Sequence, residues 1–244
     1  MKKLINNIIN FFLRLLYLLR IGKIEHLPFG ELIWVEKFAS LEHWHVTTQG
    51  NWGAVYPDSI TCASPDNVEL VEEGVRLYTH KNPQGIVGCD FEGNKKRCYY
   101  SHAEIFTLNY LKYGWFEAEI QFDKSGRGCW DAFWVNSPGE TGQHLEVDFF
   151  ENKRRMEVTT HNHKKKKQYK FTYPKLTGRH TVVGHIEPGR TTIYLDGYKI
   201  FSTKIHMPNE SDALILRFTS GLDGVENDLP YYFTINKFKY YDNQ

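Results

Sequence analysis

The sequence predicts an all-β protein in which antiparallel strands form two packed sheets, preceded by one short helix. After about Gly30, short runs of alternating apolar and polar residues are separated by turn residues, at the spacing typical of a sandwich. Aromatic residues make up 15% of the chain, which suits pleated sheets because aromatic side chains pack well on them. The 244 residues fit one such domain, since sandwiches often run to about 200–250 residues.

The first 28 residues differ from the rest. Two lysines precede a stretch over 4–19 that is rich in Leu, Ile and Phe, and its polar positions recur at helical spacing, which gives a wide apolar face. Arg14 interrupts the apolar run and residues 20–23 offer no clear cleavage site, so a signal peptide and a spanning helix both fit poorly. We predict an amphipathic helix that lies on a membrane or on the domain, with an atypical export signal as the alternative. The chain then divides into an N-terminal segment, residues 1–28, and a domain over residues 29–244.

Alternation and turn residues define the strands in chain order. Residues 31–38 alternate, and residues 68–79 hold two runs on either side of a Glu-Glu-Gly turn. Residues 113–122 alternate cleanly, with Trp115 on the same side as two glutamates. In the first half of the domain, strands are predicted at 31–38, 68–79, 102–108, 113–122 and 130–134.

The second half of the domain starts with an acidic strand that follows a loop rich in Pro and Gly at 136–142. Two later runs form a hairpin over a Glu-Pro-Gly-Arg turn, and an Asp-Gly pair turns the chain into the next strand. Antiparallel strands in two packed sheets are the natural outcome. In this half, strands are predicted at 146–151, 156–163, 169–173, 181–186, 191–195, 198–202, 214–218 and 231–241.

Charge and cysteine content exclude some classes of function. The net charge is +1, so there is no global field to attract nucleic acid, and we predict no nucleic-acid partner. The sequence has neither a C-x-x-C motif nor a His/Cys cluster with zinc spacing, and no metal site of that kind is predicted. Four cysteines allow three pairings and prove none: Cys62, Cys89, Cys98 and Cys129. Cys89 and Cys98 flank a loop that a disulfide could close.

The acidic strand carries the strongest indication of chemistry. Glu146 and Asp148 point the same way while Val147 and Phe149 point into a core, because a strand alternates faces. Strict alternation would bury Glu151, but one extra residue after Asp148, a β-bulge, returns it to the acidic face. The alternative is an edge strand whose acidic face is solvated.

A bulged strand would place the two glutamates at a useful separation. Glu146 and Glu151 would sit about four strand steps apart, roughly 13 Å between Cα atoms. Side chains that lean together could bring the carboxyl groups to about 5–6 Å, near the separation in retaining glycosidases and shorter than inverting enzymes need. One glutamate would attack the anomeric carbon, and the other would stay protonated and donate to the leaving oxygen.

Six short motifs follow one another along the domain. They are residues 113–118 (Y-G-W-F-E-A), 130–134 (W-D-A-F-W), 146–151 (E-V-D-F-F-E), 160–161 (T-H), 194–197 (Y-L-D-G) and the closing strand at 235–241. In kind and order they resemble glycoside hydrolase family 16, the laminarinase, agarase and carrageenase group with a concanavalin A-like jelly roll. The resemblance covers roughly residues 31–242, and the acidic motif has the bulged form of laminarinase-like members.

The resemblance implies a role for each acidic residue. Glu146 would be the nucleophile, Asp148 its electrostatic helper and Glu151 the general acid/base. Trp130 and Trp134 share a face by alternation, so both indoles could line one cleft and stack on sugar rings.

Two further residues are candidates for substrate binding. Trp115 lies on the side of two glutamates, which favours an open face, with core packing as the alternative reading for it and for the other two tryptophans. His161, at a family position, could hydrogen-bond the acid/base or a sugar hydroxyl, or be purely structural.

Three departures from the family pattern are visible. His185 stands where the family usually has Trp, and Asp131 stands in place of Pro. Asn236 stands where the family usually has an Asp that helps to hold a calcium ion on the convex side. The loss of that charge leaves a structural calcium doubtful, so we predict no cofactor and no metal at the site.

These observations predict a retaining, endo-acting β-glycosidase that hydrolyses a polysaccharide, with β-1,3-glucan or a related β-glycan as the default substrate. The alternatives are a carbohydrate-binding, lectin-like sandwich without catalysis, a transglycosylase on the same residues, and a structural or attachment protein. A basic turn at 164–167 would attract an acidic polysaccharide, or be a solvated hairpin. We expect a monomer with a polysaccharide partner, membrane association through the N-terminal segment, and an extracellular or membrane-associated location.

Overall fold

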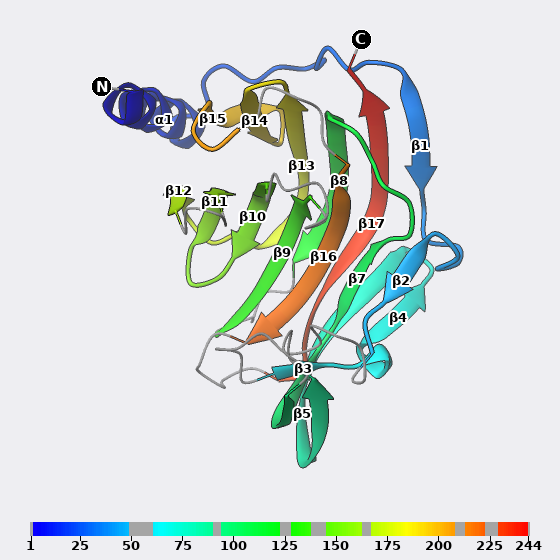
Figure 1. Cartoon of the computed structure of the whole chain (residues 1–244). Helices are drawn as coiled ribbons and strands as arrows, with labels where there is room; N and C mark the ends of the chain where they lie inside the picture. Colours follow the sequence, from blue (N-terminus) through cyan, green and yellow to red (C-terminus); the bar gives the residue numbers. More distant parts are fainter. Residues whose placement is uncertain are drawn as a thin grey trace.

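The computed structural model describes residues 2–48, 61–89, 94–122, 128–137, 145–162, 167–207, 213–222 and 229–243. Within these ranges the chain forms an N-terminal α-helix, a 3-10 turn and a series of strands (Figure 1). In order they are α1 (Lys2–Leu18), β1 (Leu32–Glu36), β2 (Trp44–Val46), β3 (Thr61–Ala63), η1 (Pro65–Asn67), β4 (Val68–Val71), β5 (Gly74–Cys89), β6 (Lys95–His102), β7 (Glu104–Thr107), β8 (Gly114–Phe122), β9 (Cys129–Asn136), β10 (Leu145–Asn152), β11 (Met156–Asn162), β12 (Lys167–Tyr173), β13 (Gly178–Glu187), β14 (Arg190–Leu195), β15 (Tyr198–Thr203), β16 (Ile215–Leu222) and β17 (Tyr231–Asp242).

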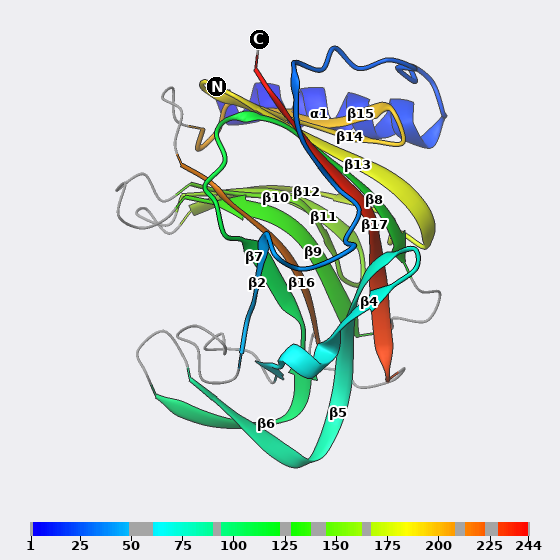
Figure 2. The same cartoon turned by 90° about the vertical axis from the view of Figure 1, so that its right-hand side faces the viewer.

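The strands form two sheets packed face to face, which confirms the predicted sandwich. One sheet has the order β15-β14-β13-β8-β17-β5-β6-β3, with β1 beside β17 and β4 beside β5. The other has the order β12-β11-β10-β9-β16-β7-β2 and contains the acidic strand β10. Figure 2 shows the two layers, with β5 and β6 curving away from the sandwich at one end. Pairing is antiparallel apart from β3 with β6, as expected for strands joined by short turns.

Aromatic side chains fill the space between the sheets. Phe133 on β9 stacks on Phe218 of β16, with ring centroids 4.8 Å apart, and both are fully buried. Phe150 of β10 meets Phe122 of the opposite sheet edge-to-face at 5.3 Å. Burial of each such ring stabilises the fold by roughly 1.5–3 kcal/mol. The high aromatic content of the sequence is therefore used mainly in the core.

A glycine sets how closely the two sheets approach beneath the acidic strand. Gly184 lies on β13, and a Cβ there would fall 2.2 Å from Cε1 of Phe149, which is far inside van der Waals contact. Phe149 is completely buried. The missing side chain at Gly184 therefore makes the space into which the ring of Phe149 inserts.

The helix α1 closes one edge of the sandwich. Asn10 is fully buried: its Nδ2 donates to the hydroxyl of Tyr169 on β12 at 3.1 Å and to the carbonyl of Ser202 on β15 at 3.2 Å. The amide of Ser202 donates to Asn10 Oδ1 at 2.9 Å, and Tyr17 packs edge-to-face on Tyr173. The helix thus covers the two edge strands β12 and β15, which would otherwise expose unpaired backbone groups. Within the part of the chain that the structure describes, no helix is long and apolar enough to cross a bilayer.

The disulfide differs from the pair suggested by the sequence. Cys62 on β3 is bonded to Cys98 on β6, with Cα atoms 5.8 Å apart, and Cys89 is not part of a disulfide. In the β5–β6 ladder Cys98 lies opposite Ile86, whereas Cys89 lies opposite Lys95. The suggested Cys89–Cys98 bridge is wrong because these residues occupy different rungs of the ladder, and the parallel strand β3 supplies the partner instead.

Candidate active site

The bulge expected in the acidic strand is present in β10. Asp148 lies opposite Trp134 of β9, but the next paired residue, Phe150, lies opposite Phe133, so β10 has one residue more than its partner. The pairing with β11 shifts at the same place, between Asp148 and Glu151. Phe149 and Phe150 are both fully buried as a result. This extra residue lets two consecutive rings enter the core and turns the following side chain outward.

The three acids consequently share one face of the sheet, which we call the acidic face: Glu146, Asp148 and Glu151 on β10, with His161 on β11. The side chains of Glu146 and Glu151 are 19% and 20% exposed, so each is partly open to solvent. Asp148 between them is 6% exposed. Two accessible glutamates on either side of a buried aspartate are thus the central feature of the face.

Burial and charge shift the ionisation of the central aspartate. The pKa of Asp148 is raised to about 7, first because burial penalises its charged form and then because Glu146 and Glu151 are negative. The hydrogen bond from His161 acts in the opposite direction and is outweighed. Near neutral pH, this carboxyl therefore holds a proton much more readily than an ordinary aspartate.

His161 joins the Glu146 side of the acidic face. Its Nε2 lies 2.9 Å from Asp148 Oδ2 in a hydrogen bond and 3.4 Å from Glu146 Oε1. Burial alone would lower the pKa of His161, but the bond to Asp148 and the charges of the three acids outweigh it and raise the pKa. The sequence suggested a contact with the acid/base; in the structure His161 instead contacts Glu146, which lies directly opposite it in the ladder, and Asp148, two residues further along β10.

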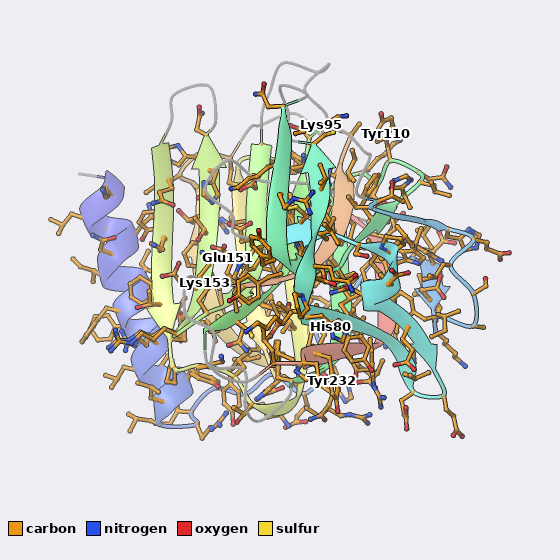
Figure 3. The ribbon with its side chains drawn as sticks, turned by 90° about the horizontal axis from the view of Figure 1, so that it is seen from below. His80, Lys95, Tyr110, Glu151, Lys153 and Tyr232 are labelled. Carbon is orange, nitrogen blue, oxygen red and sulfur yellow. A yellow bond between two sulfur atoms is a disulfide. The ribbon has the colours of Figure 1, made fainter. Side chains whose placement is uncertain are left out.

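Glu151 has a cationic neighbour that sequence reasoning missed. Lys153 Nζ lies 2.9 Å from Glu151 Oε1, and both side chains point to the face seen in Figure 3. The same ammonium lies 5.8 Å from the centre of the Trp130 ring. Lys153 follows β10 by one residue, so its place two positions after Glu151 was the available signal. The pair holds the carboxylate of Glu151 beside Trp130.

The predicted tryptophans Trp130 and Trp134 lie on the acidic face. Register places Trp134 opposite Asp148, and places Ala132, one alternation along, opposite Glu151. Trp134 is half-buried and its Nε1 donates to Thr219 Oγ1 at 3.0 Å, while Arg217 lies over its ring at 5.1 Å. Trp130 covers Gly221 of β16, where a Cβ would meet the indole at 2.4 Å. Contacts with β16 hold both indole rings in place, and each ring remains partly exposed to solvent.

Trp115 does not belong to this site. It lies on β8 in the other sheet, is 5% exposed, and packs with Val183 and Tyr194 beneath Leu27 of the N-terminal segment and Phe29 at the start of the domain. The ring of His185 stacks on it at 3.7 Å. The expectation that Trp115 binds substrate is wrong, because the polar side of β8 is the outer face of the opposite sheet and the N-terminal segment covers it.

The two remaining departures from the family pattern also lie away from the acids. Asp131 is fully buried and accepts a hydrogen bond from the hydroxyl of Tyr231, so it points away from the acidic face. Asn236 donates from Nδ2 to the carbonyl of Glu73 at 3.0 Å, and the Glu73 carboxylate faces Arg76. A calcium ion prefers several carboxylate and carbonyl oxygens. Because the amide N–H takes the Glu73 carbonyl and the described residues bring no carboxylate to Asn236, these residues do not fit calcium.

One group of side chains could hold a metal by distance alone. Ligand atoms of Glu146, Asp148 and His161 lie within 4.8 Å of one another, and among the described residues this is the only such group. The hydrogen bond between His161 and Asp148 already uses the donor atoms that a metal would need. We therefore read the group as a proton-sharing network.

The comparisons with known proteins agree with this geometry. The model of Glycosyl hydrolases family 16 matches residues 58–209, more than half of the chain, so the chain belongs to this family. It is a glycoside hydrolase that acts on polysaccharides. Comparison with curated protein sequences gives no match.

Solved structures of similar fold cover nearly the whole chain. The laminarinase catalytic domain from Thermotoga maritima MSB8 is 14% identical with a TM-score of 0.69, over 88% of this chain and 98% of that one. Porphyranase B from Zobellia galactanivorans is 16% identical with a TM-score of 0.73, over 91% and 96%. The kappa-carrageenase from Pseudoalteromonas carrageenovora is 14% identical with a TM-score of 0.68, over 89% and 97%. At these identities the likeness establishes the jelly-roll fold.

Proposed function

We propose that this glycoside hydrolase is a retaining, endo-acting β-glycosidase that cleaves a β-glycan by double displacement. Glu146 is the nucleophile, Glu151 the general acid/base and Asp148 the helper of Glu146. The observation that carries the proposal is the bulge in β10, by which both glutamates come to the same face with a buried aspartate between them. The catalytic domain is residues 29–244, acting as a monomer, and residues 1–28 form the separate N-terminal segment.

The first step forms a covalent intermediate. A carboxylate oxygen of Glu146 attacks the anomeric carbon while Glu151, as a carboxylic acid, gives its proton to the glycosidic oxygen. The bond from the anomeric carbon to that oxygen breaks, and the leaving part of the chain departs with a new hydroxyl group. Glu146 is then an ester of the sugar and Glu151 is a carboxylate.

The second step restores both groups. Glu151 takes a proton from water, the water oxygen attacks the anomeric carbon, and the ester bond to Glu146 breaks. Two displacements at one carbon return the original β configuration. A sugar hydroxyl in place of water would give transglycosylation with the same residues.

The Asp148–His161 pair serves the nucleophile. Glu146 must carry a negative charge to attack, although two other acids stand on the same face. A proton shared between Asp148 and His161, whose pKa values are both raised, reduces that repulsion and places a donor beside Glu146. The pair therefore places a cationic or neutral donor against Glu146 and fixes the orientation of its carboxyl group.

Charge on the acidic face favours a neutral glycan. Among the described residues, three cations point to this face by register or contact, and each pairs with a carboxylate: Lys153 with Glu151, Lys170 with Glu157, and Arg217 with Glu104. Glu146 and Asp148 add further negative charge, so a sulfated or uronic-acid chain would be repelled by the described part of the face. Residues 164–166 of the basic turn at 164–167, which suggested an acidic substrate, lie outside the described residues. We therefore place β-1,3-glucan or a related neutral β-glycan first.

Azide rescue combined with a polysaccharide panel tests the proposal. Glu146→Gly should lose hydrolysis of an activated β-glycoside and regain turnover with azide as an α-glycosyl azide, because azide replaces the nucleophile from the opposite face. Glu151→Gly should give the β-glycosyl azide from the second step. Product masses from the wild-type protein on a panel of neutral and sulfated polysaccharides give the linkage and the endo action.

The alternatives give different results in the same experiment. A lectin-like sandwich releases no reducing ends from any polysaccharide and binds it equally well in both variants. A transglycosylase gives products longer than the substrate supplied. Full activity in either glycine variant refutes the assignment of Glu146 and Glu151.

A further inference from the structure

The helix α1 has its apolar side turned away from the protein. Its large hydrophobic side chains, together with Leu19 just after its end, are between 39% and 64% exposed: Leu4, Ile5, Ile8, Ile9, Phe11, Phe12, Leu15, Leu16, Leu18 and Leu19. At about 100° per residue they occupy an arc of about 180°. We call this surface the apolar face of α1. Amphipathic helices that dock on a protein normally bury this side, so its exposure requires another explanation.

Specific contacts fix α1 in this orientation. Asn10 and Tyr17, on the opposite side of the helix, are the residues it buries. Asn10 makes three hydrogen bonds to β12 and β15, and Tyr17 packs on Tyr173 and Tyr198. A buried asparagine with satisfied donors and acceptor would lose these partners if the helix rolled over. The fold therefore holds the apolar face outward.

A groove with a cationic rim runs beside this face. It has a volume of about 690 Å³ and lies between α1 and the strands β14 and β15. Ile5, Ile9 and Leu13 line one side, and Arg190, Lys199 and Lys204 line the other. Arg190 also faces Glu187 at 3.5 Å, and burial together with the charge of Arg190 lowers the pKa of Lys199. An apolar wall opposite three basic groups matches an anionic amphiphile.

The charge of the N-terminal segment has the same sign. Residues 1–28 contain one acidic residue, Glu25, which pairs with Lys23, and five basic residues: Lys2, Lys3, Arg14, Arg20 and Lys23. Two copies of the chain that paired through their apolar faces would bring these charges and both cationic rims together, which is unfavourable. An anionic lipid surface would instead neutralise them. Charge therefore selects lipid over a second copy as the occupant.

We propose that this enzyme binds the surface of an anionic phospholipid membrane through α1. The helix lies flat in the interface, with its apolar face at the level of the upper acyl chains. Lys199, Lys204 and Arg190 contact lipid phosphates at the rim of the groove. The acidic face belongs to the other sheet and points away from the core, so it stays accessible to polysaccharide. Figure 2 shows α1 beside β14 and β15 and far from β5 and β6.

Vesicle co-sedimentation of the full chain tests the proposal. The probes are vesicles of phosphatidylcholine alone and of phosphatidylcholine with 30% phosphatidylglycerol, each at low and high salt. At low salt, binding to the anionic vesicles should be at least tenfold stronger than binding to vesicles of phosphatidylcholine alone. Lys199→Gln combined with Lys204→Gln should weaken it by about 25-fold, because each cation near the surface contributes about fivefold.

Variants of the apolar face separate insertion from simple charge attraction. Phe12→Ser with Leu15→Ser should reduce binding to both kinds of vesicle more than tenfold, at unchanged thermal stability and unchanged hydrolysis of a soluble glycan. The matched control is Leu70→Ser with Val87→Ser, two residues of similar exposure on other elements, which should bind like the wild type. Equal binding by the apolar-face variant and the wild type overturns the proposal. So does a dimer in sedimentation equilibrium that the Phe12 and Leu15 changes dissolve and that vesicles do not affect.

Discussion

Asp148→Asn tests whether the central aspartate holds a proton in the folded protein. The folded-state pKa of about 7 exceeds the ordinary value of 3.8, so the folded protein binds more protons than the unfolded chain between those values. Stability must then fall as pH rises through this range, since it rises with pH only where the unfolded state binds more protons. At about 1.36 kcal/mol per pH unit, a shift of about 3 units corresponds to about 4 kcal/mol. The charge-free asparagine removes this term.

His161 changes the pH dependence of stability in the same direction as Asp148. Its raised pKa gives stability that is present below its ordinary value of 6.5 and is lost as pH rises through the folded value. Part of that shift comes from the charge of Asp148, so the asparagine variant weakens it as well. Both effects make the wild type lose more stability than the variant between pH 4 and pH 8.

Urea unfolding followed by tryptophan fluorescence at pH 4, 6 and 8 gives the free energy of unfolding of both proteins. Between pH 4 and pH 8, the free energy of unfolding of the variant should rise relative to that of the wild type by up to about 4 kcal/mol. Its hydrolytic activity should fall. Glu25→Gln, at an exposed carboxylate, is the matched control and should keep the wild-type slope. Parallel pH dependence in Asp148→Asn and the wild type would refute a protonated Asp148 in the folded state.

Three further changes follow from the packing and the contacts at the site. Gly184→Ala should lower the free energy of unfolding in urea by about 3 kcal/mol or more, because its Cβ would meet the ring of Phe149 at 2.2 Å. Activity should fall with stability. Wild-type stability in this variant would show that the sheets separate easily. Trp134→Ala should raise KM about five- to tenfold with a smaller change in kcat, since a stacking platform is lost, and Tyr99→Ala, an exposed aromatic elsewhere, should leave both unchanged. Dialysis against EDTA should leave hydrolysis intact, because Asp148 and His161 already form a hydrogen bond with each other. Loss of activity that only an added divalent ion restores would instead assign a metal to Glu146, Asp148 and His161.

The fold and the bulge could be predicted because both depend on local pattern. Alternation with turn residues predicts strands, and the apolar pair Phe149-Phe150 inside an acidic run leaves one residue too many for a regular ladder. The family resemblance then named the three acids. No long-range information was needed for either result.

Long-range contacts explain what the sequence did not reveal. Alternation put Trp115 on the side of two glutamates, but only the sheet order shows that this side faces away from the core and lies under Phe29. The partner of Cys98 comes from a parallel strand 36 residues earlier, which loop length cannot predict. Amphipathicity predicted α1, yet two buried residues, Asn10 and Tyr17, decide which side of the helix the protein covers.

The catalytic geometry and the core are one structural feature in this protein. The extra residue in β10 turns Glu151 outward only because two consecutive rings can both be buried, and the space for one of them exists because β13 has glycine at position 184. A regular β10 would keep Asp148 outward and put Glu151 in the core, where an unpaired carboxylate is strongly disfavoured. The outward position of Glu151, the proposed acid/base, therefore depends on Gly184, a residue in the opposite sheet. Activity and stability should fall together along a series of larger side chains at this position, whereas Glu151→Gln should remove activity and leave stability unchanged.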